Sequence, residues 1–479
     1  MTSFTWIIDA SDLLAAALFI YGLKRMSSPL TARSGIHLAG IGMIVAVLAA
    51  FLYALSVNPE ARPHLSANGT LAVVALALGL GWAWRKGRTV PVTAMPQMVA
   101  LYNGMGGGAA AAIAAVELFG ADADPGITGR SVTALGALIG SVSLSGSIIA
   151  WAKLEGRINR PWRLRGLRVL NGSLFAGTVI LGLIVSVITR GPDTAILVGA
   201  FFVAALAFGI LMTMPIGGAD MPVVISLYNA FTGLAVGLQG LVLQNPVLMI
   251  AGMVVGSAGT LLTVIMAKAM NRSVGNVLFS NFGDADTGQQ GDIAGRLKAA
   301  EASDAATTMR YAGKVIIVPG YGLASAQAQQ KLYELVRLLQ AADVEVRFAI
   351  HPVAGRMPGH MDVLLAEAGV PYDLIEELEE ANSDFPNADV ALVIGANDVV
   401  NPAARTNKAS PIYGMPILDV ELAHQVYVIK RGQGKGYAGI ENELFYRDNC
   451  HLVYGDAQAV LGRMIQTLKD LAPAAANAA

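Results

Sequence analysis

The stretch "VIIVPGYGLASAQAQ", residues 315–329, decides how the second half of this chain is interpreted. A run of β-branched residues leads into Gly320, Tyr321 and Gly322, and an Ala/Gln-rich helical pattern follows. This order predicts a strand, a glycine turn and a helix N-terminus, the arrangement that holds a dinucleotide pyrophosphate. The pattern is relaxed, because Ser325 stands where a third glycine often allows close helix packing. An ordinary strand-to-helix turn without a ligand is the alternative.

Similar strand-like runs recur between helix-like stretches in the last part of the chain. They are "KVIIVPG", "VEVRFAI", "DVALVIGA", "QVYVIKR" and "HLVYG", and a last helix is predicted over residues 456–471. Apolar strands that alternate with helices predict a parallel, doubly wound sheet. Residues 311–479 are therefore expected to form a soluble, Rossmann-like α/β domain.

The first part of the chain has the composition of a membrane protein. The whole chain is 54% hydrophobic and 14% charged, with a mean hydropathy of +0.55, whereas soluble domains carry about 25% charged residues. A helix that spans a bilayer needs about 20 apolar residues. Windows of that kind predict nine transmembrane helices, over residues 4–24, 34–57, 65–84, 94–117, 131–152, 168–189, 194–215, 220–243 and 246–268.

Residues 1–272 are thus expected to form a helical membrane domain. Residues 273–310 lose hydrophobicity and gain Gly, Asp and Gln, which predicts a linker with a helix in its second half. The net charge of −1 argues against a nucleic-acid partner. A single cysteine, Cys450, excludes a disulfide framework.

Basic residues in the short loops predict the orientation, because cytoplasmic loops carry the excess of Lys and Arg. One set of alternate loops holds Lys24, Arg25, Arg33, Arg85, Lys86, Arg88, Lys153, Arg157, Arg160, Arg163, Arg165, Arg168, Lys268 and Arg272. The other set holds only Arg62, Arg130 and Arg190. The N-terminus is therefore expected outside, and the α/β domain in the cytoplasm.

The end of the second predicted strand indicates which dinucleotide binds. An NAD site places Asp or Glu there to hold the ribose 2′-hydroxyl. Here the strand ends at Ile350 and continues into "HPVAGRMPGHM" without a carboxylate, which favours NADP. Lys430 and Arg431, at a later strand end before a Gly-rich loop with Lys435, suit the 2′-phosphate. A solvated basic loop is the alternative.

Two further loops carry candidate site residues. "VIGANDVVNPAA" places Asn397, Asp398 and Asn401 beyond a strand's carboxyl end, where ligands of open α/β sheets bind, although such residues often only form turns. "HPVAGRMPGHM" offers His351 and Arg356 as cofactor-loop residues. Its two histidines are nine residues apart without a further spaced ligand group, so no metal site is expected.

Polar residues within the predicted spans are candidates for a proton path, because such groups are costly at bilayer depth. Asp220 begins the eighth span, Asn229 lies further along it, and Arg272 at the end of the ninth is a candidate ion-pair partner for Asp220. Asn103 lies in the fourth span and Ser147 in the fifth. Helix capping by Asp220 and interhelical hydrogen bonding by Asn229 are the structural alternatives.

Several long strings together resemble one family. "PGYGLASAQAQ", "HPVAGRMPGHMDVLLAEAGVPYD", "VIGANDVVNPAA", "KGYAGIENELF", "IGGADMPVV" and "KAMNRS" closely resemble β subunits of proton-translocating NAD(P) transhydrogenases, over essentially the whole chain. The resemblance implies an integral protein of the bacterial inner (plasma) membrane. It also implies α subunits that carry an NAD(H) domain and further transmembrane helices, and a dimer of α–β units.

In this family, hydride passes directly between the two nicotinamides, and protons cross through the membrane helices. Asp398 is then expected to act in positioning and coupling at the hydride-transfer site. The expected NADP(H)-binding residues are Gly320, Tyr321, Gly322, Ala324, Ser325, His351, Arg356, Gly395, Asn397, Asp398, Lys430, Arg431, Gly436 and Tyr437. The expected proton path and coupling residues are Asn103, Ser147, Asp220, Asn229 and Arg272.

One position departs from the family pattern. Asn103 stands where some members have a membrane histidine, and the resemblance allows a partner chain to supply that histidine. The proton path is therefore expected to be incomplete without another subunit. A membrane transporter or channel gated by NADP(H) remains the alternative function. A quinone reductase is disfavoured, since no flavin, haem or iron–sulfur ligand set is visible.

Overall fold

The computed structural model describes residues 5–56, 64–120, 126–158, 166–188, 194–217, 220–271, 273–279, 295–355, 357, 359–408, 410, 412–432, 434, 436 and 438–471. Two compact units are present. One comprises Met1–Ala152, Gly166–Met214 and Leu227–Leu261, and the other Lys153–Arg165, Pro215–Ser226 and Leu262–Ala479. Because this division cuts through three helices, the predicted boundaries at residues 272 and 310 stay a prediction.

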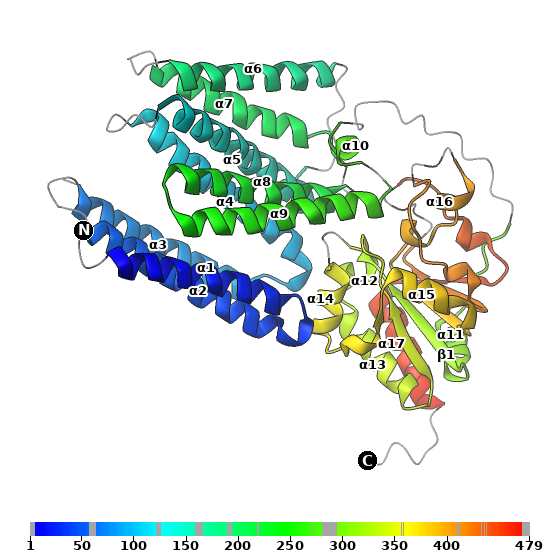
Figure 1. Ribbon diagram of the computed structural model, residues 1–479. Helices are drawn as coiled ribbons and strands as arrows, with labels where there is room; N and C mark the ends of the chain where they lie inside the picture. Colours follow the sequence, from blue (N-terminus) through cyan, green and yellow to red (C-terminus); the bar gives the residue numbers. More distant parts are fainter. Residues whose placement is uncertain are drawn as a thin grey trace. The chain divides into compact units, whose positions relative to one another are not determined.

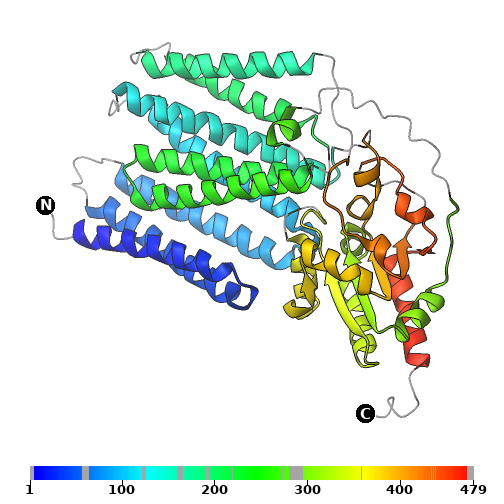
Figure 2. The ribbon, with the colours of Figure 1, turned by 45° about the vertical axis from the view of Figure 1, so that its right-hand side comes forward.

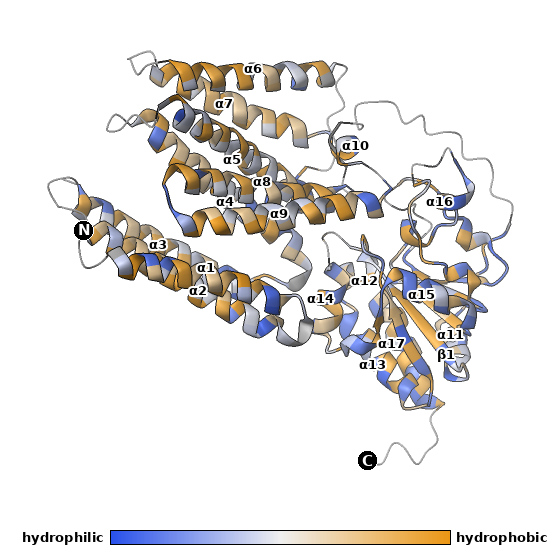
Figure 3. Ribbon diagram, viewed as in Figure 1, coloured by the Kyte–Doolittle hydropathy of each residue, from blue (hydrophilic) through white to orange (hydrophobic). Residues whose placement is uncertain are grey.

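Within the described residues, nine helices are long and apolar enough to cross a membrane, as predicted. The hydropathy colouring shows apolar residues along their length (Figure 3). Several helices extend beyond the predicted spans. They are α1 Thr5–Met26, α2 Pro29–Ser56, α3 Leu65–Thr89, α4 Met95–Phe119, α5 Gly126–Leu154, α6 Leu167–Val187, α7 Thr194–Thr213, α8 Met221–Val242 and α9 Pro246–Ala269 (Figure 1).

Glycines bring α8 and α9 into backbone contact. A Cβ on Gly252 of α9 would collide with the backbone of Gly237 on α8, and a Cβ on Gly233 would collide with the backbone of Gly256. In lipid, burying apolar side chains between helices brings no hydrophobic gain, so close backbone packing takes its place. The spacing of four residues on both helices therefore fixes how this pair packs.

The C-terminal residues form the predicted parallel sheet. Its strand order is β3-β2-β1-β4-β5-β6, and every neighbouring pair is parallel. The chain reverses its direction of winding between β1 and β4, which creates a crevice beyond their carboxyl ends. The strands are β1 Lys314–Pro319, β2 Glu345–Ala349, β3 Ile375–Glu376, β4 Val390–Ile394, β5 Gln425–Lys430 and β6 Cys450–Tyr454.

Strand β3 was absent from the sequence prediction. It contains only two residues, Ile375 and Glu376, so no alternation of apolar and polar side chains can develop. It pairs with Phe348 and Ala349 at the end of β2. The sixth strand is therefore a consequence of tertiary pairing at the edge of the sheet.

Helices and short turns connect the strands and cover the sheet (Figure 2). All five residues of β4 are buried, as expected for a strand with both faces covered. The remaining α-helices are α10 Val274–Phe279, α11 Ala302–Arg310, α12 Tyr321–Ser325, α13 Gln329–Gln340, α14 His360–Glu367, α15 Leu378–Asp384, α16 Ala403–Thr406 and α17 Ala457–Asp470.

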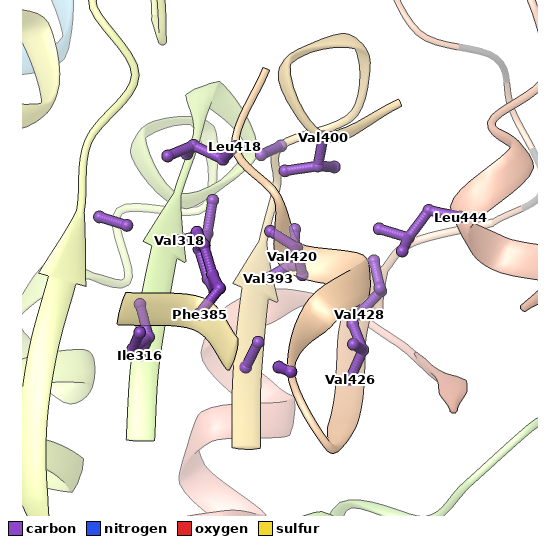
Figure 4. Packing of buried hydrophobic residues seen from close by; sticks show 14 of the residues in the cluster. Ile316, Val318, Phe385, Val393, Val400, Leu418, Val420, Val426, Val428 and Leu444 are labelled. Carbon is purple, nitrogen blue, oxygen red and sulfur yellow. The ribbon is translucent and has the colours of Figure 1, made fainter. Parts of the chain in front are cut away.

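One cluster of buried apolar side chains, here called the core cluster, packs on one face of the sheet (Figure 4). Alternate residues of β1 and β5 belong to it, because side chains two residues apart share a face of a strand. Segments that cover this face supply the rest. Its labelled members are Ile316, Val318, Phe385, Val393, Val400, Leu418, Val420, Val426, Val428 and Leu444.

The α8–α9 contact predicts a large cost for a side chain at Gly252. Gly252→Val should destabilise the chain by about 1–3 kcal/mol, because overpacking forces two backbones apart. Gly177→Val on α6 is the matched control, since a Cβ there meets nothing within 4 Å. Thermal unfolding of both purified variants in detergent measures the difference. Equal shifts of the midpoint would contradict close packing at Gly252.

Candidate functional site

The loops after β1 and β4 touch each other through their backbones. The Gly320 N–H donates to the Ile394 oxygen at 2.9 Å, and the Gly322 N–H donates to the Gly395 oxygen at 3.0 Å. A Cβ on Gly320 would lie 2.6 Å from the Ala396 Cα, and a Cβ on Gly322 would lie 2.5 Å from the Gly395 Cα. Glycine is therefore required on both sides of this contact.

The helical pattern after the glycines is divided into two helices. The short helix α12 ends at Ser325, and α13 begins at Gln329. Between them Gln327 has a φ of +51°, a left-handed backbone that interrupts the helix. The quoted stretch therefore forms the predicted strand and glycine turn, but a kinked pair of helices follows.

A second pair of loops meets around Asp398. The Asp398 Oδ2 accepts a hydrogen bond from the Ala438 N–H at 2.9 Å. A Cβ on Gly436 would collide with the Asp398 carboxylate. Next to it, the Asn442 side chain donates to the carbonyl and side-chain oxygens of Asn397, at 2.9 and 3.0 Å. These contacts fix the loop after β5 to the loop after β4.

Asn401 also holds the loop after β4 to the segment 441–443. It is fully buried, and its side-chain nitrogen donates to the Glu441 oxygen at 3.0 Å. Its side-chain oxygen accepts from the N–H groups of Ala403 and Glu443. Asn401 therefore has a structural role, which is one of the two interpretations of its loop.

Two cations stand at the carboxyl end of β5. The Lys430 Nζ lies 4.3 Å from the centre of the Phe445 ring, close enough for a cation–π interaction. Partial burial lowers the pKa of Lys430, and Glu441 opposes that shift. The Arg431 guanidinium donates to the Ser325 hydroxyl at 3.4 Å, a long hydrogen bond at an exposed position.

These loops enclose a cavity of about 760 Å³, within the range of cofactor sites. Asp220, which belongs to the same compact unit, also lines it. Among the predicted nucleotide residues, the lining includes Gly320, Tyr321, Gly322, Gly395, Asn397, Asp398, Lys430, Arg431 and Gly436. A glycine-lined wall at the crevice with two cations at one strand end fits a phosphorylated dinucleotide.

The cavity also has apolar lining residues that the sequence did not single out. Val353 and Ala354 contribute from the loop after β2, and Ile412 and Met415 from the segment after α16. An apolar wall suits the flat rings of a nucleotide. The only sequence signal for Ile412 and Met415 was an apolar run in a Pro/Gly-rich loop, which core packing explains equally well.

His351 lies beneath the loops rather than in the cavity lining. It is buried, its Nε2–H donates to the Pro416 oxygen at 2.7 Å, and its Nδ1 accepts from the Val353 N–H at 3.2 Å. Both ring nitrogens are thus used within the protein, and His351 positions the loop that carries Val353. Ala324 is buried, and Ser325 also lies outside the lining.

Three predicted residues, Arg272, Arg356 and Tyr437, lie outside the described residues. In the part of the chain that the structure describes, no group of His, Cys, Asp and Glu could hold a metal ion.

Three membrane helices place polar groups together. The Thr232 hydroxyl on α8 donates to the Asn103 carbonyl oxygen on α4 at 2.8 Å, and it lies 2.7 Å from the Ser143 hydroxyl on α5. Ser147 is fully buried on α5 and faces Gly104. Asn229, one turn before Thr232, is partly buried. The sequence did not single out Thr232 or Ser143.

The comparison with known proteins agrees with this architecture. A family model described as NAD(P) transhydrogenase beta subunit matches residues 8–467. The chain belongs to this family. Two relatives named NAD(P) transhydrogenase subunit beta, one from Rhodospirillum rubrum and one from its strain ATCC 11170, are each 45% identical over 480 residues. Each match covers 96% of this chain and 98% of the relative.

Membership confirms the predicted identification as a β subunit of a proton-translocating transhydrogenase. With nine apolar helices among its described residues, the chain is an integral membrane protein. The family implies that it uses NADP(H), and the β-subunit name implies an α-subunit partner.

Burial of His351 predicts a dependence of stability on pH. Desolvation lowers the pKa of His351 from 6.5 to about 4 in the folded protein. The unfolded chain therefore takes up a proton below about pH 6.5 while the folded chain does not, so stability falls as the pH drops from 6.5 to 4, by roughly 3 kcal/mol in total. Calorimetry of the purified chain at pH 7.5 and 5 measures the loss.

The control for this prediction is His351→Gln, which cannot take up a proton in this range. The variant should have a lower unfolding midpoint at pH 7.5, because Gln does not reproduce both hydrogen bonds. The further drop between pH 7.5 and 5 should be smaller than in the native chain. An unchanged pH dependence would show that another group is responsible.

Proposed function

We propose that this subunit binds NADP(H) in the cavity at the carboxyl edge of the sheet and couples hydride transfer to proton passage through its membrane helices. The α subunit carries NAD(H). The observation that supports the assignment is a cavity at the β1–β4 crevice with Lys430 and Arg431 in its lining. The absence of a carboxylate directly after β2 favours the phosphorylated cofactor.

In this proposal, different lining residues contact different parts of the cofactor. Lys430 and Arg431 hold the 2′-phosphate by charge-assisted hydrogen bonds. Gly320 and Gly322 allow the pyrophosphate to approach the backbone. Asp398, fixed by the Ala438 N–H, sets the position of the loop beside the nicotinamide. Arg356 and Tyr437 are proposed as further contacts on the basis of the sequence resemblance.

The bound nicotinamide supplies the hydride chemistry. The protein's own residues position the ring and exclude water, and no side-chain acid or base is required. The two cofactors differ only in a phosphate remote from the reacting carbon, so hydride exchange alone is nearly balanced in free energy. A membrane potential of 100 mV supplies about 2.3 kcal/mol per charge, roughly fiftyfold in an equilibrium.

To use this energy, proton passage must change how tightly the site holds NADP⁺ and NADPH. Asp220 supports this link, since it lines the cavity and stands directly before α8. Asn229 lies on the same helix, and Asn103 contacts that helix through Thr232. We infer that Asn103, Ser147, Asp220, Asn229 and Arg272 belong to the proton path or its coupling.

The orientation and assembly are also part of the proposal. The bias of basic residues places the N-terminus outside and the NADP(H) site in the cytoplasm of a bacterium. The full enzyme is proposed to be a dimer of α–β units, in which the α subunit adds transmembrane helices. The membrane histidine that Asn103 replaces is expected on one of those helices.

The test uses the chain co-expressed with its α subunit in sealed vesicles. NADPH and an NAD analogue should produce both analogue reduction and a pH change across the membrane. Asn229→Leu should abolish the pH change, because an apolar side chain cannot pass a proton, while the C-terminal domain retains NADP(H) binding. Binding of NADPH without any analogue reduction would instead favour a gated transporter.

The cation pair provides a separate prediction. Lys430→Ala combined with Arg431→Ala should weaken NADPH binding by about 3 kcal/mol, because two charge-assisted contacts are lost. Binding of NADH to the same site should change little. Equilibrium dialysis of the purified enzyme measures both. The control is Lys331→Ala with Arg337→Ala on α13, which removes the same charge outside the cavity lining. If Lys430→Ala with Arg431→Ala weakens the binding of NADPH and NADH equally, the 2′-phosphate assignment is refuted.

A further inference from the structure

The chain enters the sheet domain along the free edge of β6. The Leu452 N–H donates to the Lys298 oxygen at 2.7 Å, and the Ala300 N–H donates to the Leu452 oxygen at 3.0 Å. Ala299 and Leu452 form a parallel β-bridge. Residues 295–300, here called the entry strand, therefore extend the sheet by one short parallel segment beyond β6.

Close packing and backbone pairing attach the entry strand to the sheet domain. Gly295 has a φ of +141°, and a Cβ there would lie 2.9 Å from the Tyr446 Cβ, so only glycine fits this close approach. Leu297 packs against the core cluster. The ion pair of Lys298 with Asp448 is solvent-exposed and adds little. Backbone pairing and the Leu297 contact are thus the main attachments.

The entry strand lies close behind the cation of the nucleotide site. Leu297 and Tyr446 line a small cavity of about 90 Å³ together with Lys430, Asn397 and Phe445. Lys430 and Asn397 also line the large cavity. Phe445 belongs to the core cluster against which Leu297 packs, and its ring supports the Lys430 ammonium at 4.3 Å. Leu297 and Lys430 therefore line the same small cavity, and Phe445 is part of its wall.

We propose that the entry strand is a positioning element for Lys430. Leu297 presses on the layer that contains Phe445, and the Phe445 ring sets where the ammonium stands in the nucleotide cavity. Leu297 is then a positioning residue for NADP(H) binding, although it does not line the large cavity. The inference rests on the proposed function, since it concerns Lys430 as a ligand of the 2′-phosphate.

The position of the entry strand in the chain bears on how cofactor affinity could be adjusted. Along the chain, the entry strand is the first described segment after the membrane helices whose backbone pairs with the sheet. A shift of a few tenths of an ångström at a cation changes a charge-assisted hydrogen bond markedly, because such bonds are short. A displacement of the entry strand would thereby adjust cofactor affinity without direct contact with the cofactor.

A double-mutant cycle tests the proposal, with NADPH as the probe and the co-expressed α–β enzyme as the protein. Leu297→Ala should weaken NADPH binding three- to tenfold. In the Lys430→Ala background the same change should have less than a twofold effect, because its route to the cofactor is gone. Leu378→Ala is the matched control. It packs against the same core cluster but not in the small cavity, and it should change affinity less than twofold.

Three outcomes would overturn the proposal. They are a full effect of Leu297→Ala in the Lys430→Ala background, an equal loss from Leu378→Ala, and no effect of Leu297→Ala on a normally folded enzyme. Circular dichroism and thermal unfolding of each variant establish whether it is folded. Leu297→Met keeps the side-chain volume, so it should retain the NADPH affinity that Leu297→Ala loses. Unchanged NADPH affinity in Lys430→Ala alone would instead refute the proposed function.

Discussion

The contact between the backbones of Gly320, Gly322 and Gly395 is the constraint on which the nucleotide site depends. It brings the loops after β1 and β4 together at the point where the sheet changes its winding direction. No other residue type fits, because any Cβ would overlap backbone atoms on the opposite loop. The crevice lies beside this contact, and the segments after β2 and β5 supply further parts of its lining.

Polar side chains hold the loop after β4 and the loop after β5 together. Asp398 and Asn442 each bind backbone groups of another loop, and the fully buried Asn401 joins its own turn to residues 441–443. Such networks stabilise a structure only when their members are satisfied. They are therefore well suited to hold Lys430 and Gly436 in place, and poorly suited to tolerate substitution. The site thus combines hydrogen-bonded loops with the two cations Lys430 and Arg431.

Much of this arrangement could be predicted from the sequence, because the deciding signals are local. Uninterrupted apolar windows marked the nine helices, and the run before Gly320 marked the strand and turn. The rest depends on tertiary contacts. Nothing near Gln327 reveals that its helix breaks there, and the two-residue β3 exists only through pairing with β2. The ring of His351, a predicted cofactor residue, bonds to Pro416, 65 positions away, a contact that no local pattern indicates.

The role of His351 restricts how cofactor preference can be redesigned. Enzymes of this architecture that select the unphosphorylated dinucleotide carry an acid where the second strand ends, and here that place is next to an imidazole committed to two loops. Installing an acid at position 351 would remove both of its hydrogen bonds and bury a charge. A change of selectivity in this fold is therefore expected to be less disruptive at Lys430 and Arg431, at the carboxyl end of β5, where Arg431 is exposed.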